Sequence, residues 1–212
     1  MTTGLSLSLG NTASFVGLQI AIIAAFGAGE STLRGLSGGL LILAGVGAAF
    51  TGMGSDAGTL GELDWKIQGH VLLSLFAYGL LTVGALLSVY ALAQDQRLRS
   101  RKLSPVNQLF APLETTERLL FSVTTTGFIV LLLAVVSGLA FVDNLFAQHL
   151  VHKTVLSLIA LFLFGLLLAG RQFAGWRGRR AMYLYLWGFV VLGLAYFGSR
   201  YILEYILGRS WS

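Results

Sequence analysis

Long, uninterrupted runs of apolar residues, separated by short polar segments, dominate this chain. Six runs approach or exceed the ~20 residues that a helix needs to cross a bilayer core, and they lie near residues 11–28, 35–53, 70–93, 119–142, 150–169 and 182–207. The runs are continuously apolar and do not alternate with polar residues, so we expect helices and not barrel strands. The pattern predicts an all-α fold: one polytopic membrane helix bundle, a single domain over residues 1–212.

The composition agrees with an integral membrane protein, since 56% of the residues are apolar and only 11% are charged. The chain has no cysteine, which excludes disulfides, thiolate metal sites and covalent attachment of haem through its own thiols. No basic residue precedes the first apolar run. We therefore expect no cleavable signal peptide and count that run as a span.

The basic residues predict the orientation, because connections rich in lysine and arginine stay on the cytoplasmic side of a membrane. The connections 94–118 and 170–181 carry most of them: Arg97, Arg99, Arg101, Lys102, Arg118, Arg171, Arg177, Arg179 and Arg180. The more acidic segment 54–69 and the short segment 143–149 then face outward. Both termini are consequently expected outside.

The formal charge of +5 does not indicate nucleic-acid binding, because the arginines lie beside span ends and no aromatic-rich soluble domain surrounds them. Membrane lipids are the expected partner. In GWRGRRA, which spans 175–181, the tryptophan suits the membrane interface, and the three arginines are expected to meet anionic headgroups.

The 94–118 connection contains both prolines of the chain and mixes polar with apolar residues, so we expect it to lie along the cytoplasmic surface. It separates two halves of three predicted helices each. A weak internal echo supports this division, because HVLLS at 70–74 resembles HKTVLS at 152–157.

Glycine is abundant, with 27 residues, and the second apolar run begins GLSGGLL. Gly35 and Gly39 lie there at the small-xxx-small spacing that lets helix backbones approach closely. We expect these glycines to serve tight helix packing and assign them no binding role.

Two of the three histidines, His70 and His152, open apolar runs that both enter the membrane from the outer face. Neutral imidazole ligates iron well, and two histidines at one depth suggest a haem held between the third and fifth spans, packed together. Because the chain has no cysteine to attach it covalently, we expect such a haem to be b-type. A lone interfacial histidine is more often a simple polar group than a ligand, so that interpretation stays open. His149, one turn before His152, is a substitute ligand, although its place in the short loop favours a solvated role.

Arg200 is the other unusual residue, because it falls inside the last apolar run, where a charge is costly without a partner. Glu204, one turn later, offers an intrahelical ion pair. A guanidinium is also well shaped for a haem propionate. The two roles are compatible.

Five segments, taken in order along the chain, match the pattern of a known family: HVLLSLFAYGLLTVGALLSVY at 70–90, PLETTERLLF at 112–121, HKTVLS at 152–157, GWRGRRA at 175–181 and LAYFGSRYILE at 194–204. In these segments the chain resembles the CcsA-type cytochrome c assembly family, and within it the YpjD-like inner-membrane proteins. The resemblance implies a multi-span protein of the bacterial inner (plasma) membrane, with outward-facing histidines that ligate haem. It also implies other cytochrome c maturation proteins as partners.

The chain departs from that family in two respects. Members that deliver haem carry a tryptophan-rich outer segment, whereas the tryptophans here are scattered at Trp65, Trp176, Trp187 and Trp211. The YpjD-like members lack that segment too, and they usually have further spans before the matching region. We therefore expect either a short version of the family pattern or a chain truncated at its N-terminus, and delivery to an apocytochrome is not implied.

The alternative function is a cofactor-free membrane scaffold or transporter-associated subunit, whose histidines serve packing or proton sensing. A transporter is expected to bury carboxylates near the middle of its spans, and these apolar runs contain none there. The scaffold is thus the stronger alternative. No Ser/His/Asp set, carboxylate pair or phosphate loop can be assembled on one face, so we do not expect an enzyme.

Overall fold

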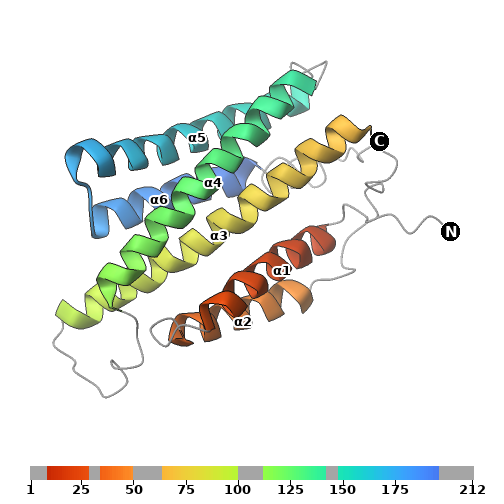
Figure 1. Ribbon diagram of the computed structural model, residues 1–212. Coiled ribbons are helices and arrows are strands. Elements are labelled where there is room, and N and C mark those ends of the chain that lie inside the picture. Colours follow the sequence, from red (N-terminus) through yellow and green to blue (C-terminus); the bar gives the residue numbers. More distant parts are fainter. Residues whose placement is uncertain (1–8, 29–33, 50–63, 100–111, 142–147, 196–212) are drawn as a thin grey trace.

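The computed structural model describes residues 9–28, 34–49, 64–99, 112–141 and 148–195 (Figure 1). Within these ranges the chain is helical and has no strand, which confirms the all-α prediction. The helices are α1 (Leu9–Ala28), α2 (Arg34–Ala49), α3 (Trp65–Arg99), α4 (Leu113–Phe141), α5 (Gln148–Ala174) and α6 (Arg179–Gly193).

Three of these helices are long and apolar enough to cross a membrane: α3, α4 and the Lys153–Ala174 part of α5. The apolar parts of α1 and α2 are shorter, at Ser14–Ala25 and Ser37–Ala49. The described part of α6 ends at Gly193. Both termini, predicted outside, fall beyond the described ranges, as does the remainder of the last predicted span.

The long helices extend past their apolar runs. The polar last turn of α3 remains helical because Arg99 pairs with Asp95 one turn earlier, Nε to Oδ2 at 3.0 Å. The start of α4 follows Pro112, and Glu114 in its first turn complements the positive end of the helix dipole. Apolar length alone therefore underestimates these helices at the end that carries Arg99 and Glu114.

Four of the helices form a bundle, and the other two lie against one side of it. In the bundle, α3 and α5 each pack against both α4 and α6. The hairpin of α1 and α2 contacts the bundle chiefly through α1, which packs on α3 (Figure 1). The chain is thus organised as a two-helix hairpin and a four-helix bundle, and not as two three-helix halves.

Residues in the interior of the bundle are as apolar as those that face lipid, so close contacts and polar contacts decide which faces pack inward. Tyr185 of α6 is fully buried and reaches Gly84 of α3, where no larger residue would fit. Its hydroxyl donates a hydrogen bond of 2.9 Å to the carbonyl of Leu81. Its ring meets Phe164 of α5 edge-on, with centroids 5.1 Å apart. Tyr185 thereby joins three helices.

In α2, Gly47 lies in close contact with α1, but Gly39, singled out from the sequence, does not provide close packing. A Cβ built on Gly39 or Gly45 meets nothing within 4 Å in the described structure. The close approach lies at Gly17 of α1, where a Cβ would stand 2.9 Å from the carbonyl oxygen of Ala44. The prediction for Gly39 is therefore wrong, and Gly35 lies outside the residues whose surroundings are described.

Candidate functional site

His70 lies in the second turn of α3, half-buried against the last turns of α4. Its Nδ1 is 2.9 Å from the carbonyl oxygen of Ala134 and 3.0 Å from Oγ of Ser137. The Ser137 hydroxyl donates to the same carbonyl oxygen at 2.8 Å. Two groups of α4 therefore hold one nitrogen of the imidazole.

These contacts assign the imidazole proton of His70. A carbonyl oxygen only accepts, and the hydroxyl proton of Ser137 already points at that carbonyl, so both contacts require a proton on Nδ1. In the neutral ring the lone pair is then on Nε2. Histidines that bind metals commonly have this arrangement, with one ring N–H held by a backbone carbonyl and the other nitrogen on the metal.

Gly138 makes this close contact possible. A Cβ at position 138 would stand 2.8 Å from Cε1 of His70 and 3.3 Å from its Nδ1, so a side chain there would displace the ring. Ala134, Ser137 and Gly138 together form what we call the His70 cradle. The cradle fixes the orientation of the ring in advance of any ligand.

The surroundings of His70 carry little charge. Lys66, one turn earlier, has its Nζ 5.9 Å from the ring centroid of Phe141, and Trp65 is exposed. Over the described ranges, no group of three or more His, Asp or Glu side chains lies close enough to hold a metal ion. This end of the bundle offers one oriented ring nitrogen and not a preformed metal cage.

The other predicted site residues are placed only in part. His149 and His152 fall in the first turns of α5, and their side chains lie outside those described. Arg200 and its predicted partner Glu204 lie beyond residue 195. The first turn of α5 lies at the same end of the bundle as the start of α3 and the end of α4 (Figure 1).

The predicted side-by-side packing of the third and fifth spans is wrong. In the described residues α3 and α5 are separated by α4 and α6, each of which contacts both. The connections from α4 to α5 and from α5 to α6 are short, and short connections favour contacts between successive antiparallel helices. The helices α3 and α5 therefore lie diagonally across the bundle.

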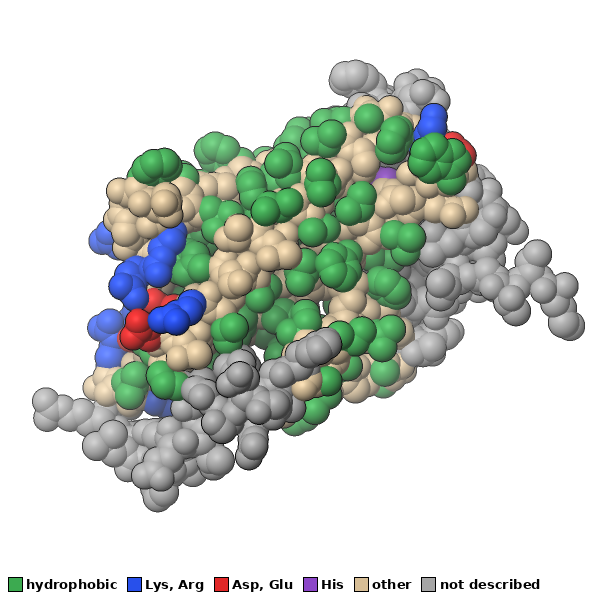
Figure 2. Space-filling model, viewed as in Figure 1, with side chains coloured by type: hydrophobic (Ala, Val, Ile, Leu, Met, Phe, Trp, Pro, Cys, Tyr) green, Lys and Arg blue, Asp and Glu red, His purple; other side chains and the backbone are tan. Residues whose placement is uncertain are grey.

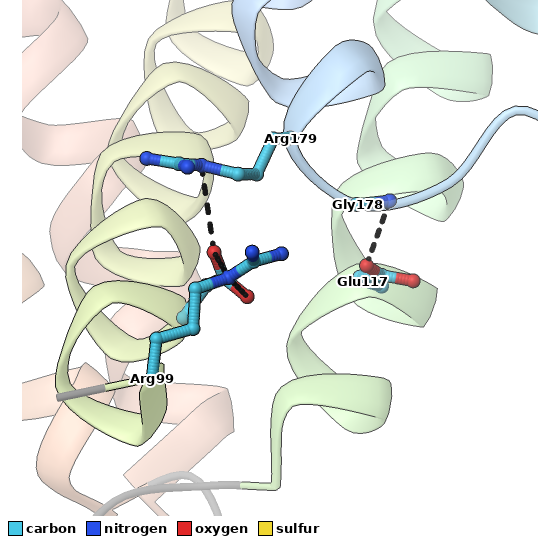
Figure 3. A network of polar contacts seen from close by, with 5 residues as sticks. Arg99, Glu117, Gly178 and Arg179 are labelled. Carbon is cyan, nitrogen blue, oxygen red and sulfur yellow. Dashed lines mark hydrogen bonds and ion pairs between the residues drawn. The ribbon is translucent and has the colours of Figure 1, made fainter. Parts of the chain in front are cut away.

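Most of the charged side chains visible on the face shown in Figure 2 lie at the opposite end of the bundle. Asp95 of α3 accepts hydrogen bonds of 3.0 and 3.2 Å from Nε of Arg99. The same carboxylate lies 3.5 Å from Nε of Arg179 at the start of α6 (Figure 3). Asp95 thereby joins α3 to α6.

Glu117 makes the corresponding connection from α4. Its Oε1 accepts a hydrogen bond of 3.0 Å from the backbone N–H of Gly178 (Figure 3). Its Oε2 lies 3.6 Å from Nε of Arg177. Gly178 precedes α6 with φ of 64°, which glycine adopts without strain. The carboxylate thus lies at the positive end of the α6 dipole.

The rest of the GWRGRRA segment is also held by the protein. Trp176 packs on Gly170 and donates its backbone N–H to the carbonyl of that residue at 3.0 Å. The Arg171 guanidinium lies 4.5 Å from the ring centroid of Phe121. The expectation that all three arginines of the segment serve lipid headgroups needs correction, because the first two bind carboxylates. Arg180 is exposed and has no ion pair with a described residue.

Sequence reasoning missed the His70 cradle and the two carboxylates. Ser137 and Gly138 lie near the end of the fourth apolar run, at the predicted membrane depth of His70. This shared depth is the one sequence feature from which a contact with His70 could have been predicted. Asp95 and Glu117 border basic connections, where ion pairs between helices are expected. Their partners follow only from the helix arrangement.

Comparison with known proteins places these features in a family. The family model described as Cytochrome C assembly protein matches residues 5–207. The inner membrane protein YpjD of Escherichia coli (strain K12) is 40% identical over 137 residues, which make up 65% of this chain and 52% of YpjD. An uncharacterized 28.8 kDa protein of Azospirillum brasilense is 30% identical over 144 residues, 67% of this chain and 53% of that protein.

The chain spans about half the length of these curated relatives. No solved structure matches it. The similarity to an inner membrane protein, together with the long apolar helices, identifies a multi-pass inner-membrane protein. The family resemblance drawn from the segments between residues 70 and 204 is confirmed, and the chain belongs to the cytochrome c assembly protein family.

Proposed function

We propose that this haem-handling membrane protein binds a b-type haem at the outer face of the membrane, with Nε2 of His70 as an axial ligand. The observation that carries the proposal is the His70 cradle, which engages Nδ1 through two acceptors and leaves the lone pair on Nε2. Family membership supports haem as the ligand. An axial ligand requires this arrangement, with one ring N–H held by the protein and the lone pair of the other nitrogen directed to the metal.

His152 is the proposed second axial ligand, with His149 as its substitute. Both belong to the first turns of α5, which lie at the His70 end of the bundle (Figure 1). Because α3 and α5 lie diagonally across the bundle, a haem bound by both helices lies within the end of the bundle. Iron held by two imidazoles supplies a low-spin redox centre.

The protein's own residues have separate roles in this proposal. The cradle orients the His70 ring and strengthens its basicity through the Nδ1 hydrogen bonds. Arg200 steadies a haem propionate while it pairs with Glu204. The chain binds haem and does not catalyse a reaction, and other cytochrome c maturation proteins are its proposed partners. The absence of cysteine keeps the haem non-covalent.

Haem titration of the detergent-purified chain tests the assignment. The wild type is expected to show the sharp reduced bands of a bis-histidine haem, and His70→Ala or His152→Ala should remove or change them. His149→Ala is the matched control and should matter less. An unchanged bound-haem spectrum in the double variant His70→Ala/His152→Ala would overturn the assignment of these two ligands, whereas a wild type that binds no haem would favour the cofactor-free scaffold.

Arg200 is tested in the same titration. If the guanidinium contacts a propionate, Arg200→Leu should weaken haem binding roughly ten- to a hundredfold, as expected for a charge-assisted hydrogen bond. Arg200→Lys should restore part of that loss, since it keeps the charge without the two-pronged geometry. Equal affinity of wild type and Arg200→Leu would leave Arg200 with a structural role only.

A further inference from the structure

One face of α6 changes in character along its length. Its exposed residues follow one another at spacings of three and four, which places them on a single stripe: Arg180, Tyr183, Trp187, Val190 and Leu194. The stripe begins with a charge at the arginine-rich end, continues with two aromatic residues and ends with two aliphatic ones. We call it the α6 stripe.

The α6 stripe is not part of the protein core. Tyr183 is 50% exposed, Trp187 66% and Leu194 52%, while the opposite face of α6 buries Tyr185 and Leu192 completely. The bundle therefore uses one side of α6 and leaves the other, with its aromatic rings, to the surroundings. Arg180 has no ion pair with a described residue, unlike Arg179 beside it, which lies 3.5 Å from Asp95.

We propose that the α6 stripe binds one anionic phospholipid of the cytoplasmic leaflet, with its phosphate on Arg180 and its acyl chains along Val190 and Leu194. A guanidinium is shaped to bind phosphate through two parallel hydrogen bonds. Tyrosine and tryptophan prefer the layer between headgroups and hydrocarbon, which is where Tyr183 and Trp187 then lie. The α6 stripe runs from a charged residue through aromatic residues to aliphatic residues. A phospholipid likewise runs from its phosphate through the interface to its acyl chains.

The length of the α6 stripe agrees with one leaflet. Fourteen residues separate Arg180 from Leu194, which corresponds to about 21 Å along a helix. Half of a hydrocarbon core is ~15 Å, and one headgroup layer adds ~5–7 Å. Side chains of a helix lean toward its N-terminus, so Arg180 extends toward the headgroups. A second protein helix in this position would have to supply a carboxylate for Arg180 inside the membrane interface.

Native mass spectrometry of the full chain tests this site. The chain is reconstituted in phosphatidylcholine with or without phosphatidylglycerol, and the retained phosphatidylglycerol is counted. The wild type should retain it in preference to phosphatidylcholine. Arg180→Gln should lower its apparent affinity about fivefold, the effect expected for one basic residue at an anionic surface. Trp187→Ala should cause a smaller loss, and Arg180→Lys should retain most of the binding.

Arg118→Gln is the matched control. Arg118 lies at the same end of the bundle and is 81% exposed, but it pairs with Glu114. The next exposed residues on α4 carry hydroxyl groups, whereas those that follow Arg180 on the α6 stripe carry aromatic rings. If Arg118→Gln and Arg180→Gln lost equal amounts of phosphatidylglycerol, the effect would come from general surface charge, and the proposed site would be overturned. Displacement of phosphatidylglycerol by the same concentration of inorganic phosphate would make it a simple anion site and equally overturn it.

A third outcome concerns protein contacts. If Arg180→Gln or Trp187→Ala changed the oligomeric mass and left lipid retention unchanged, the α6 stripe would be an interface between copies of the chain, against the proposal. Circular dichroism of each variant confirms that it remains helical. If Arg180→Gln fails to fold, Arg180→Lys takes its place in the test. The proposal then requires Arg180→Lys to retain more phosphatidylglycerol than Trp187→Ala.

Discussion

The two ends of the four-helix bundle are built from different chemistry. At one end, Asp95 and Glu117 bind arginines and a backbone N–H from the start of α6, so that each carboxylate is matched by groups of the protein itself. At the other end, His70 is held through Nδ1, and its second ring nitrogen carries the lone pair. The carboxylates of the first end are matched by protein groups, whereas the second end presents the ring nitrogen to which we assign the proposed haem.

This difference separates structural from binding polar groups in a membrane protein. Charged groups that are partly buried and paired with protein groups fix the arrangement of helices, and removal of one partner leaves the other uncompensated. A half-buried imidazole with one nitrogen hydrogen-bonded to the protein has a fixed orientation. The lone pair on its other nitrogen can then bind a metal. The comparison predicts that variants at the charged end change stability, and that variants at the His70 end change haem binding.

The largest expected effect concerns the orientation of both ends. Reporter fusions after residues 62 and 146 should report the outer side, and fusions after residues 102 and 178 the cytoplasm, because the arginines cluster at one end. The result is all-or-none. A reversed pattern would put the His70 cradle at the cytoplasmic surface and break the comparison.

The next largest effect is on stability. Glu117→Ala should lower the free energy of unfolding by about 1.5–3 kcal/mol, because it removes a charge-assisted hydrogen bond from Gly178 and leaves Arg177 without its carboxylate. Unfolding in mixed detergent, followed by circular dichroism, measures this loss. Glu114→Gln is the control, since that carboxylate is 72% exposed and should change stability by less than ~1 kcal/mol. A loss of haem in Glu117→Ala without a loss of stability would contradict the division between the two ends.

A smaller effect is expected from crowding the cradle. Gly138→Leu should weaken haem binding about tenfold, because the new side chain must displace the His70 ring. Gly69→Ala is the matched control beside His70, since a Cβ at position 69 meets nothing within 4 Å. Haem titration of the two variants decides the matter. Equal affinities would show that the ring orientation set by α4 is irrelevant to binding.

The smallest effect is expected at Ser137. Ser137→Ala removes one of the two acceptors for the Nδ1 proton of His70 and leaves the Ala134 carbonyl in place. Haem affinity should therefore fall only about threefold. Ser137→Thr keeps the hydroxyl and should behave like the wild type. A loss as large as that of His70→Ala would show that the Ala134 carbonyl does not hold the ring.

The sequence predicts those features of the molecule that produce a recognisable pattern of residues along the chain, and it misses the others. Apolar runs report helices directly, so the helices and the placement of His70 near the start of α3 were predicted. The pairing of helices leaves no such signal, because lipid-facing and core-facing residues are equally apolar. The sequence therefore misplaced α3 beside α5 and overlooked Ser137 and Gly138. Polar groups at span ends were visible, but the partners of Asp95 and Glu117 required the fold.

The most direct test of the central claim replaces the His70 ring with a free imidazole. The His70→Gly variant is loaded with haem, and its reduced-minus-oxidised absorption spectrum is recorded before and after imidazole is added. The account predicts that the sharp low-spin bands of the wild type are lost in His70→Gly and return with imidazole, because the added ring takes the vacated position on the iron. Wild-type bands in His70→Gly without imidazole would contradict the claim that His70 binds haem.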